Sequence, residues 1–151
     1  MKQVKIITAQ EAAQLVKDGD VVTTNGFVGS GQPEALTSAL EERFLNTGSP
    51  KDLTLIYAAS QGNTDGRGGD HFAHEGMLKK AILGHWNAVT SLQKLVNENK
   101  IQAYNRPQGT LSQYFRDVAA HRLGTITHVG LDTFADPRIS GGRLNDVTKE
   151  D

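Results

Sequence analysis

The segment at residues 18–33 constrains the fold of this chain more than any other, and its sequence is DGDVVTTNGFVGSGQP. A β-branched run leads into a loop with three glycines, and Pro33 then opens an amphipathic pattern. Glycine permits a positive φ and a close approach to backbone amides, while a helix N-terminus adds a positive dipole. The segment therefore predicts a strand–loop–helix unit that can hold a developing negative charge.

The composition excludes several classes of function. A formal charge of −1 over 151 residues argues against a dedicated nucleic-acid binder, which needs a basic surface. The absence of cysteine excludes a disulfide framework and a thiol nucleophile. The first apolar run is too short for a signal peptide, and no stretch approaches the ~20 apolar residues of a membrane span. We expect one cytoplasmic domain that binds neither nucleic acid nor membrane.

Helical and strand patterns alternate along the chain. Thr8 and Glu11 form a capping-box pattern for a helix that ends near residues 18–19, and Pro33 suits the first position of a helix that Gly48 ends. Further helices are predicted around residues 89–96 and 111–118, and strands at residues 21–24, 53–58, 81–83, 101–104 and 125–129. This alternation predicts an α/β fold with an open, mainly parallel sheet flanked by helices.

In such a sheet the ligand lies at the carboxyl ends of the strands. Glycines, amides and a histidine follow the predicted strands at residues 25–31, 60–63, 84–86 and 105–109. We therefore expect these four loops to meet along one edge. The polar tail at residues 135–151 offers little to bury, so it is either a frayed end or the point where a longer protein has been cut.

The glycine-rich loop is the first candidate site. Its glycine order differs from the dinucleotide fingerprint, and it lacks the Gly-Lys-Ser/Thr end of a P-loop. An oxyanion site built from backbone N–H groups is the physical role that remains, with a plain structural turn as the alternative. The residues proposed to bind substrate or oxyanion here are Asn25, Gly26, Phe27, Val28, Gly29 and Gly31.

A second candidate is the stretch Pro107-Gln108-Gly109-Thr110-Leu111, where Thr110 is the expected cap of a helix. Gln108 and Gly109 then stand at the carboxyl edge, unless the stretch is a simple turn with a solvated glutamine.

Other polar residues have weaker patterns. The order at His71 and His74 differs from a zincin motif and no third ligand is near, so we expect no metal. His85 precedes a tryptophan that either walls a ligand channel or lies in the core. Residues 65–70 suggest a mobile loop in which Arg67 is a possible phosphate contact.

Two of these motifs resemble family I coenzyme A transferases. The family's alpha-part signature reads Asp-Gly, two residues, three apolar residues, Gly-Gly-Phe, three residues, Gly-x-Pro. The segment at residues 18–33 follows this signature with two departures. Asn25 replaces the first glycine of the pair, and Thr23 and Thr24 replace apolar residues. The family's Pro-Gln-Gly-Thr-Leu motif recurs at residues 107–111. The resemblance implies that Gln108 reaches the reacting acyl group. It also implies acyl or coenzyme A contacts from Ser60, Gln61, Asn63 and His85.

The resemblance is closest to bacterial acyl-CoA:acetate/propionate/acetoacetate transferases. It implies a coenzyme A transferase-like fold, a coenzyme A thioester as substrate with small carboxylates, and no permanently bound cofactor. The family's nucleophile is a glutamate in a Glu-Asn-Gly motif of the second half, whereas Glu98-Asn99-Lys100 lacks the glycine. Residues 1–151 are therefore expected to be an incomplete N-terminal part, inactive alone, that needs the C-terminal half or a beta-type subunit and forms a homo-oligomer.

Two alternatives remain open from the sequence. A sugar-phosphate isomerase or deaminase of related fold would bind ribose or hexosamine phosphates. A non-catalytic coenzyme A-binding domain would bind the nucleotide without turnover.

Overall fold

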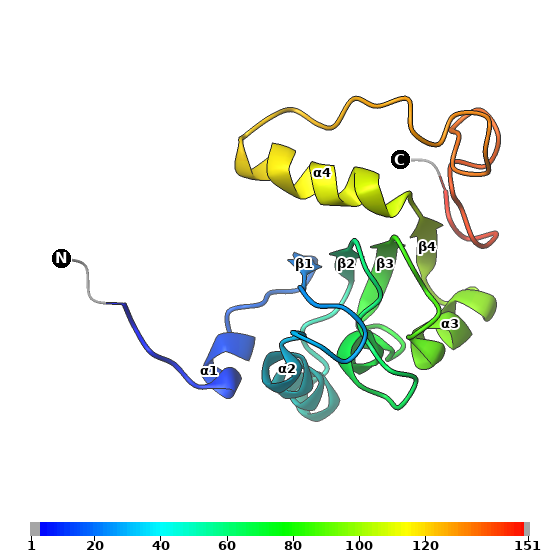
Figure 1. Cartoon of the computed structure of the whole chain (residues 1–151). Helices are drawn as coiled ribbons and strands as arrows, with labels where there is room; N and C mark the ends of the chain where they lie inside the picture. Colours follow the sequence, from blue (N-terminus) through cyan, green and yellow to red (C-terminus); the bar gives the residue numbers. More distant parts are fainter. Residues whose placement is uncertain (1–3, 150–151) are drawn as a thin grey trace.

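A four-stranded parallel sheet forms the centre of the molecule, a computed structural model that describes residues 4–149 (Figure 1). The strands lie side by side in chain order, each hydrogen-bonded in parallel to the next. They are β1 (Val21–Thr23), β2 (Leu53–Tyr57), β3 (Leu78–Leu83) and β4 (Gln102–Asn105). This arrangement confirms the predicted α/β class and the first four predicted strands.

The helices are unevenly distributed around the sheet. In Figure 1, α1, α2 and α3 lie on one side, while α4 lies beyond the ends to which the strand arrows point. The helices are α1 (Ala9–Ala13), α2 (Glu34–Thr47), η1 (Gly68–Phe72, a 3-10 helix), α3 (Thr90–Asn97) and α4 (Gln108–Ala119). None of them, within the described residues, is long and apolar enough to cross a bilayer.

The core lies between the sheet and helices α1 to α3. Alternate side chains of β2 enter it, and Leu53, Leu55 and Tyr57 are completely buried. Leu83 of β3 and Leu92 of α3 are buried with them. Burying each such side chain contributes roughly 1.5–3 kcal/mol, so this cluster fixes the register of the sheet and hence the edge where the strands end.

Two helix boundaries follow local chemistry. The capping box is confirmed, because the Glu11 N–H donates to Thr8 Oγ1 (3.1 Å) and the Thr8 N–H donates to the Glu11 carboxylate (2.8 Å). Helix α1 nevertheless ends at Ala13, before the predicted residues 18–19. The Arg43 guanidinium accounts for this, since it donates to the carbonyls of Ala13 (2.6 Å) and Val16 (2.7 Å) and ties α2 to the end of α1.

The prediction of a fifth strand at residues 125–129 is wrong, because this segment forms no strand and its Ile126 side chain is fully exposed. The Thr125 hydroxyl donates to Asp117 Oδ2 (2.6 Å), which draws the chain back to the end of α4 instead of along the sheet. The prediction of Thr110 as a helix cap is also wrong. Helix α4 begins at Gln108, and Thr110 Oγ1 is buried without a hydrogen-bond partner among the described residues.

The segment after α4 is not a frayed tail within the described residues. It returns along the outer edge of β4, where the Asn105 N–H donates to the Gly142 carbonyl (2.8 Å) and the Leu144 N–H donates to the Ala103 carbonyl (3.0 Å). The Ala103 N–H donates to the Thr148 hydroxyl (2.7 Å). Backbone groups that an edge strand leaves unpaired are thereby satisfied.

Candidate active site at the carboxyl edge

The glycine-rich loop leaves β1 and folds back on itself. Phe27 and Ser30 exchange two backbone hydrogen bonds of 2.9 Å, which makes a narrow tip. At the base of the loop Gly26 has a φ of +140°, and a Cβ there would lie 2.8 Å from the backbone nitrogen of Gln32. No other residue type fits this close approach, so glycine at position 26 sets the shape of the loop.

Val28 carries backbone strain within this loop. Its φ is +52°, a left-handed value that costs a β-branched residue on the order of 1–3 kcal/mol. The Val28 N–H donates to the Ser60 carbonyl (2.7 Å), and the Val28 carbonyl accepts from the Gly62 N–H (3.1 Å). These two hydrogen bonds hold the strained residue against the loop that follows β2. Nothing in the sequence signals this conformation.

The loop after β2 supports the glycine-rich loop through hydrogen bonds. Ser60 and Gln61 are both 2% exposed. Ser60 Oγ accepts from the Ala88 N–H (3.2 Å), and Gln61 Nε2 donates to the Thr24 carbonyl (2.8 Å) at the start of the glycine-rich loop. Asn63 is exposed, and its Nδ2 donates to the Asp65 carboxylate (2.9 Å).

Gln108 is the first residue of α4 and is exposed. The start of α4 sits close over the end of β3, because a Cβ on Gly84 would lie only 3.0 Å from the Gln108 Cα. Glycine at position 84 therefore allows Gln108 to stand directly above the strand ends, a packing role that sequence reasoning did not assign.

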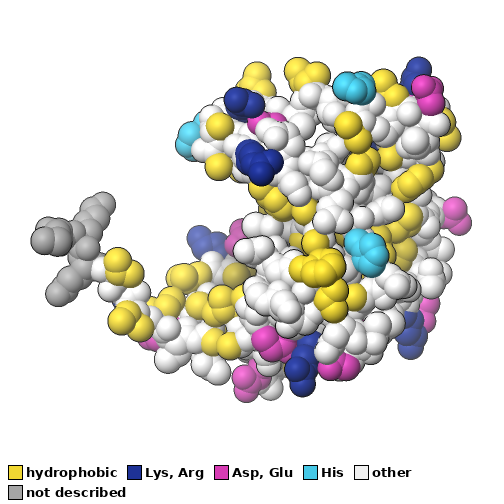
Figure 2. Space-filling view, viewed as in Figure 1, with side chains coloured by type: hydrophobic (Ala, Val, Ile, Leu, Met, Phe, Trp, Pro, Cys, Tyr) yellow, Lys and Arg dark blue, Asp and Glu magenta, His cyan; other side chains and the backbone are white. Residues whose placement is uncertain are grey.

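Two hollows flank Gln108, and Figure 2 shows the surface hollowed beneath α4. The first, of about 380 Å³, is lined by Phe27, Val28, Ser60, Asn63, Thr64, His85, Asn87, Ala88 and Gln108. The second, of about 310 Å³, is lined by Thr24, Asn25, Gly26, Ala58, Ala59, Gln61, Gln108, Ser112, Phe115 and Arg116. Nine of the twelve residues proposed from the sequence therefore line one hollow or both, whereas Gly29, Gly31 and Gly109 line neither.

The amides of the glycine-rich loop divide into used and available donors. Those of Phe27, Val28 and Ser30 are consumed by hydrogen bonds within the fold. Asn25 and Gly26 line the second hollow, and their N–H groups donate to no group among residues 4–149. Available donors beside a carboxamide side chain form an arrangement that can stabilise an oxyanion.

Arg116 is a lining residue that sequence reasoning missed. It is exposed and lies on the face of α4 that also carries Gln108, Ser112 and Phe115. The spacing of 4, 7 and 8 residues from Gln108 is that of one helix face, so a helical projection from Gln108 would have found it. A guanidinium here provides a positive charge for a carboxylate or phosphate.

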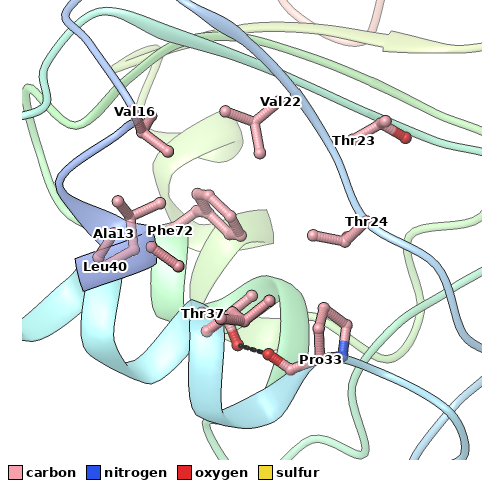
Figure 3. Close-up of a pocket in the computed structure, with 11 residues that line it drawn as sticks. Ala13, Val16, Val22, Thr23, Thr24, Pro33, Thr37, Leu40 and Phe72 are labelled. Atoms are coloured by element: carbon pink, nitrogen blue, oxygen red, sulfur yellow. Dashed lines mark hydrogen bonds between the residues drawn. The ribbon is translucent and has the colours of Figure 1, made fainter. Parts of the chain in front are cut away.

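A third hollow, of about 180 Å³, lies between α1, β1 and α2 (Figure 3). Its labelled side chains are mostly apolar, and the Thr37 hydroxyl bonds to the Pro33 carbonyl (3.3 Å). No charged side chain from residues 4–149 lines it. It carries no group for chemistry and is a gap at the open edge of the core.

The remaining polar candidates have structural partners. His71 and His74 bond to glutamates of α2, and the described part of the chain holds no cluster of three or more residues suited to a metal. Trp86 packs against the core. The prediction of a loop at residues 65–70 is wrong from residue 68 onward, because residues 68–72 form the buried η1.

Asp70, in η1, is buried and caps α3 by accepting from the N–H groups of Ser91 (3.1 Å) and Leu92 (3.2 Å). Burial raises the pKa of this carboxyl, and the two hydrogen bonds only partly oppose the increase. Burial, assisted by the charge of Asp70, also raises the pKa of Tyr57. Neither group lines the two hollows, so their role is to hold the scaffold.

Comparison with known proteins agrees with this geometry. The family model described as coenzyme A transferase matches residues 6–150. The chain is 41% identical to the acetate CoA-transferase YdiF of Escherichia coli K12 over 151 residues, covering 99% of this chain and 28% of YdiF. It is 38% identical to the caffeate CoA-transferase of Acetobacterium woodii, covering 97% of this chain and 28% of that protein.

The structural match is equally close. The crystal structure of YdiF from Escherichia coli O157:H7 superimposes with a TM-score of 0.92 at 40% identity, covering 98% of this chain and 29% of that one. The chain thus spans less than a third of the length of these relatives. A family match over nearly every residue, with the predicted loops gathered at one edge, shows that this chain belongs to the coenzyme A transferase family.

Proposed function

We propose that this chain forms the acyl-binding and oxyanion-binding wall of an acyl-CoA:carboxylate coenzyme A transferase. One observation carries the proposal. Gln108 stands between two hollows at the carboxyl edge, and one of them is also lined by Asn25 and Gly26, whose N–H groups have no hydrogen-bond partner among the described residues.

The chemistry requires such a wall. A carboxylate attacks the thioester carbonyl of the acyl-CoA, a C–O bond forms, the C–S bond breaks, and coenzyme A leaves as a thiolate. The carbonyl oxygen is negatively charged in between. The N–H groups of Asn25 and Gly26 and the carboxamide of Gln108 stabilise that charge, and each such donor is worth roughly 10²–10³ in rate.

The shape of the first hollow suits a short acyl chain. Phe27 and Val28 provide its apolar wall, and Asn63 and His85 provide polar groups at its rim. The substrates proposed are coenzyme A thioesters of acetate, propionate or acetoacetate, with no permanently bound cofactor. Arg116 in the second hollow attracts the incoming carboxylate.

The nucleophile is proposed to come from outside this chain. No Asp or Glu among the described residues lines either hollow, and the sequence has no Glu-Asn-Gly motif. A glutamate of a C-terminal half or a beta-type subunit completes the site and forms a glutamyl-CoA intermediate. A relative supports this division. The acetate CoA-transferase subunit alpha of Escherichia coli K12 is 28% identical to this chain over 132 residues, covering 87% of this chain and 57% of that subunit.

This chain matches a second crystal structure of YdiF at 40% identity with a TM-score of 0.92, and that structure is described as a thioester complex with CoA. The match supports a coenzyme A thioester as the ligand proposed for this chain. Membership of the transferase family disfavours the sugar-phosphate isomerase alternative. We further propose that the complete protein is a cytoplasmic homo-oligomer.

The test is an exchange assay between acetyl-CoA and propionate. The chain alone is expected to be inactive, whereas a chimaera in which it replaces the matching N-terminal segment of YdiF is expected to turn over. Enzyme-like exchange by the chain alone would show that the assignment of roles is wrong.

A thermal-shift comparison completes the test. Coenzyme A is expected to stabilise the chimaera, and ribose or hexosamine phosphates are not. A chimaera that binds coenzyme A but never turns over would favour the non-catalytic alternative.

A further inference from the structure

Behind the glycine-rich loop, two histidines and two glutamates form one hydrogen-bonded cluster. His71 Nε2 lies 2.8 Å from Glu34 Oε1, and His71 Nδ1 lies 2.6 Å from Glu41 Oε2. The second oxygen of Glu41 lies 2.5 Å from His74 Nε2. Glu34 and Glu41 are seven residues apart on α2, so they share one helix face and reach the same ring.

The geometry favours the doubly protonated state of the His71 ring. A carboxylate only accepts hydrogen bonds, so a ring with a carboxylate oxygen at each nitrogen must donate from both. That ring is the imidazolium. Burial disfavours the charged ring, but the hydrogen bonds and charges of Glu34 and Glu41 outweigh it and raise the pKa of His71.

Glu34 connects this ring to the glycine-rich loop. Its second oxygen, Oε2, accepts from Gln32 Nε2 (3.2 Å) and from the Gly68 N–H (3.1 Å). The Gln32 backbone is the group that lies against Gly26 at the base of the loop. A continuous series of contacts therefore runs from His71 through Glu34 and Gln32 to Gly26.

We propose that His71, as the imidazolium, is a positioning residue for the glycine-rich loop, because it orients Glu34 to hold Gln32 and the base of the loop closed. This inference rests on the proposed function of the Gly26 amide as an oxyanion donor. When the ring loses a proton, one nitrogen presents a lone pair to a carboxylate oxygen, and the two repel. Glu34 or Glu41 then turns away, and the base of the loop loosens.

The charged groups around His71 come from two segments, α2 and the stretch around η1. The charged groups are Glu34, Glu41 and Asp70, together with Arg67, which acts on Glu34, and the titratable His74 bonds to Glu41. The pKa of His71 is raised from its usual 6.5, so its contribution is complete below pH 6.5 and is lost as the pH rises through the higher folded-state value.

Glu34 behaves in the opposite sense. Burial raises the pKa of Glu34, but the hydrogen bonds from His71 and from the Gly68 N–H together lower it by more. The net pKa is therefore below the usual 4.5. Its contribution is present above pH 4.5 and is lost on acidification below that. The contributions of His71 and Glu34 are therefore both complete between about pH 4.5 and 6.5, and the His71 contribution is lost as the pH rises above that range.

The experiment compares His71→Gln, Glu41→Gln and the control His74→Gln, which removes the outer contact to Glu41 and a ring contact with Phe44 but leaves both bonds of His71 in place. In the YdiF chimaera, exchange is expected to fall along an alkaline limb above pH 6.5. His71→Gln is expected to lose about tenfold in kcat at pH 6 and to abolish that limb, with a smaller change in KM. Glu41→Gln removes one negative charge, so the limb is expected to move to lower pH. His74→Gln is expected to have the smaller effect.

Amide hydrogen exchange of the 151-residue chain separates this inference from the function it rests on. Peptides covering residues 25–33 are expected to lose protection as the pH rises above 6.5, after correction for intrinsic rates, and to be unprotected in His71→Gln. Peptides of α3 are the internal reference. Loss of protection without any change in catalysis would support the positioning role and contradict the catalytic role of the loop. Protection that is independent of pH, or a limb that Glu41→Gln does not move, would overturn the inference.

Discussion

Two neighbouring loops at the same edge of the sheet have opposite characters. The glycine-rich loop after β1 is largely exposed and keeps the amides of Asn25 and Gly26 available. The loop after β2 begins with Ser60 and Gln61, which are 2% exposed. The Ser60 carbonyl accepts from the Val28 N–H and the Gln61 side chain donates to the Thr24 carbonyl, so both residues support the first loop. One loop presents donors and the other holds them in place.

The comparison shows why position at a strand end does not by itself make a residue functional. Both loops contain small and polar residues, and the sequence suggested ligand contacts for both. A donor that the fold already uses cannot serve a substrate without breaking a hydrogen bond worth about 0.5–1.5 kcal/mol net. Burial and pairing thus distinguish the presenting loop from the supporting one.

The largest effect is expected for Gly26→Ala, which would break the presenting loop. Its Cβ would lie 2.8 Å from the Gln32 nitrogen at a φ of +140°, so the loop must move and displace both available amides. We expect exchange by the chimaera to fall by about 10³. The control is Gly29→Ala, which meets nothing within 4 Å and should change the rate little. Equal losses in the two variants would contradict the choice of donors.

The next effect is expected for Gln108→Ala. Removal of the carboxamide between the two hollows should lower kcat by about 10², with little change in melting temperature, because the side chain is exposed. Gln10→Ala, at an exposed glutamine of α1, is the matched control. A loss that appears only in KM would assign Gln108 to binding and not to the transition state.

A moderate effect on stability is expected for Gln61→Ala in the supporting loop. The substitution leaves the Thr24 carbonyl without its donor and is expected to lower the free energy of unfolding by about 1–3 kcal/mol. Urea denaturation measures this, with the exposed Asn63→Ala as the control. If the order of the two variants were reversed, Gln61 would not be a support.

The smallest effect is expected for Asp70→Asn, in η1 at the start of α3. The asparagine keeps an acceptor for the Ser91 and Leu92 N–H groups and removes a buried charge. Because burial raises the pKa of Asp70 above its usual 3.8, the native state disfavours the carboxylate at neutral pH. The variant should therefore be more stable at pH 7, and the gain should vanish as the pH falls towards 3.8. A gain that is independent of pH would contradict this account.

Local sequence signals were sufficient for much of the scaffold. Apolar runs bounded by glycine and proline located four strands, and the Thr8–Glu11 pair located the start of α1. The failed prediction of a fifth strand has a physical cause. Residues 125–129 have strand propensity but pair with no strand of the described residues, and Thr125 bonds to Asp117 instead. Propensity yields to whichever partner the fold supplies.

The sequence alone determined which residue types lie at the carboxyl edge, including the glycine-rich loop and the motif around Gln108. It could do so because glycine, proline and alternating apolar residues control the backbone over only a few positions. The tertiary structure decided which of those residues are available. The positive φ of Val28 is held by the hydrogen bond from its N–H to the Ser60 carbonyl, and His71 bridges two glutamates of α2. Both sets of hydrogen bonds join segments about 30 or more residues apart. Such contacts depend on how the strands and helices pack, and short-range patterns carry no record of that packing.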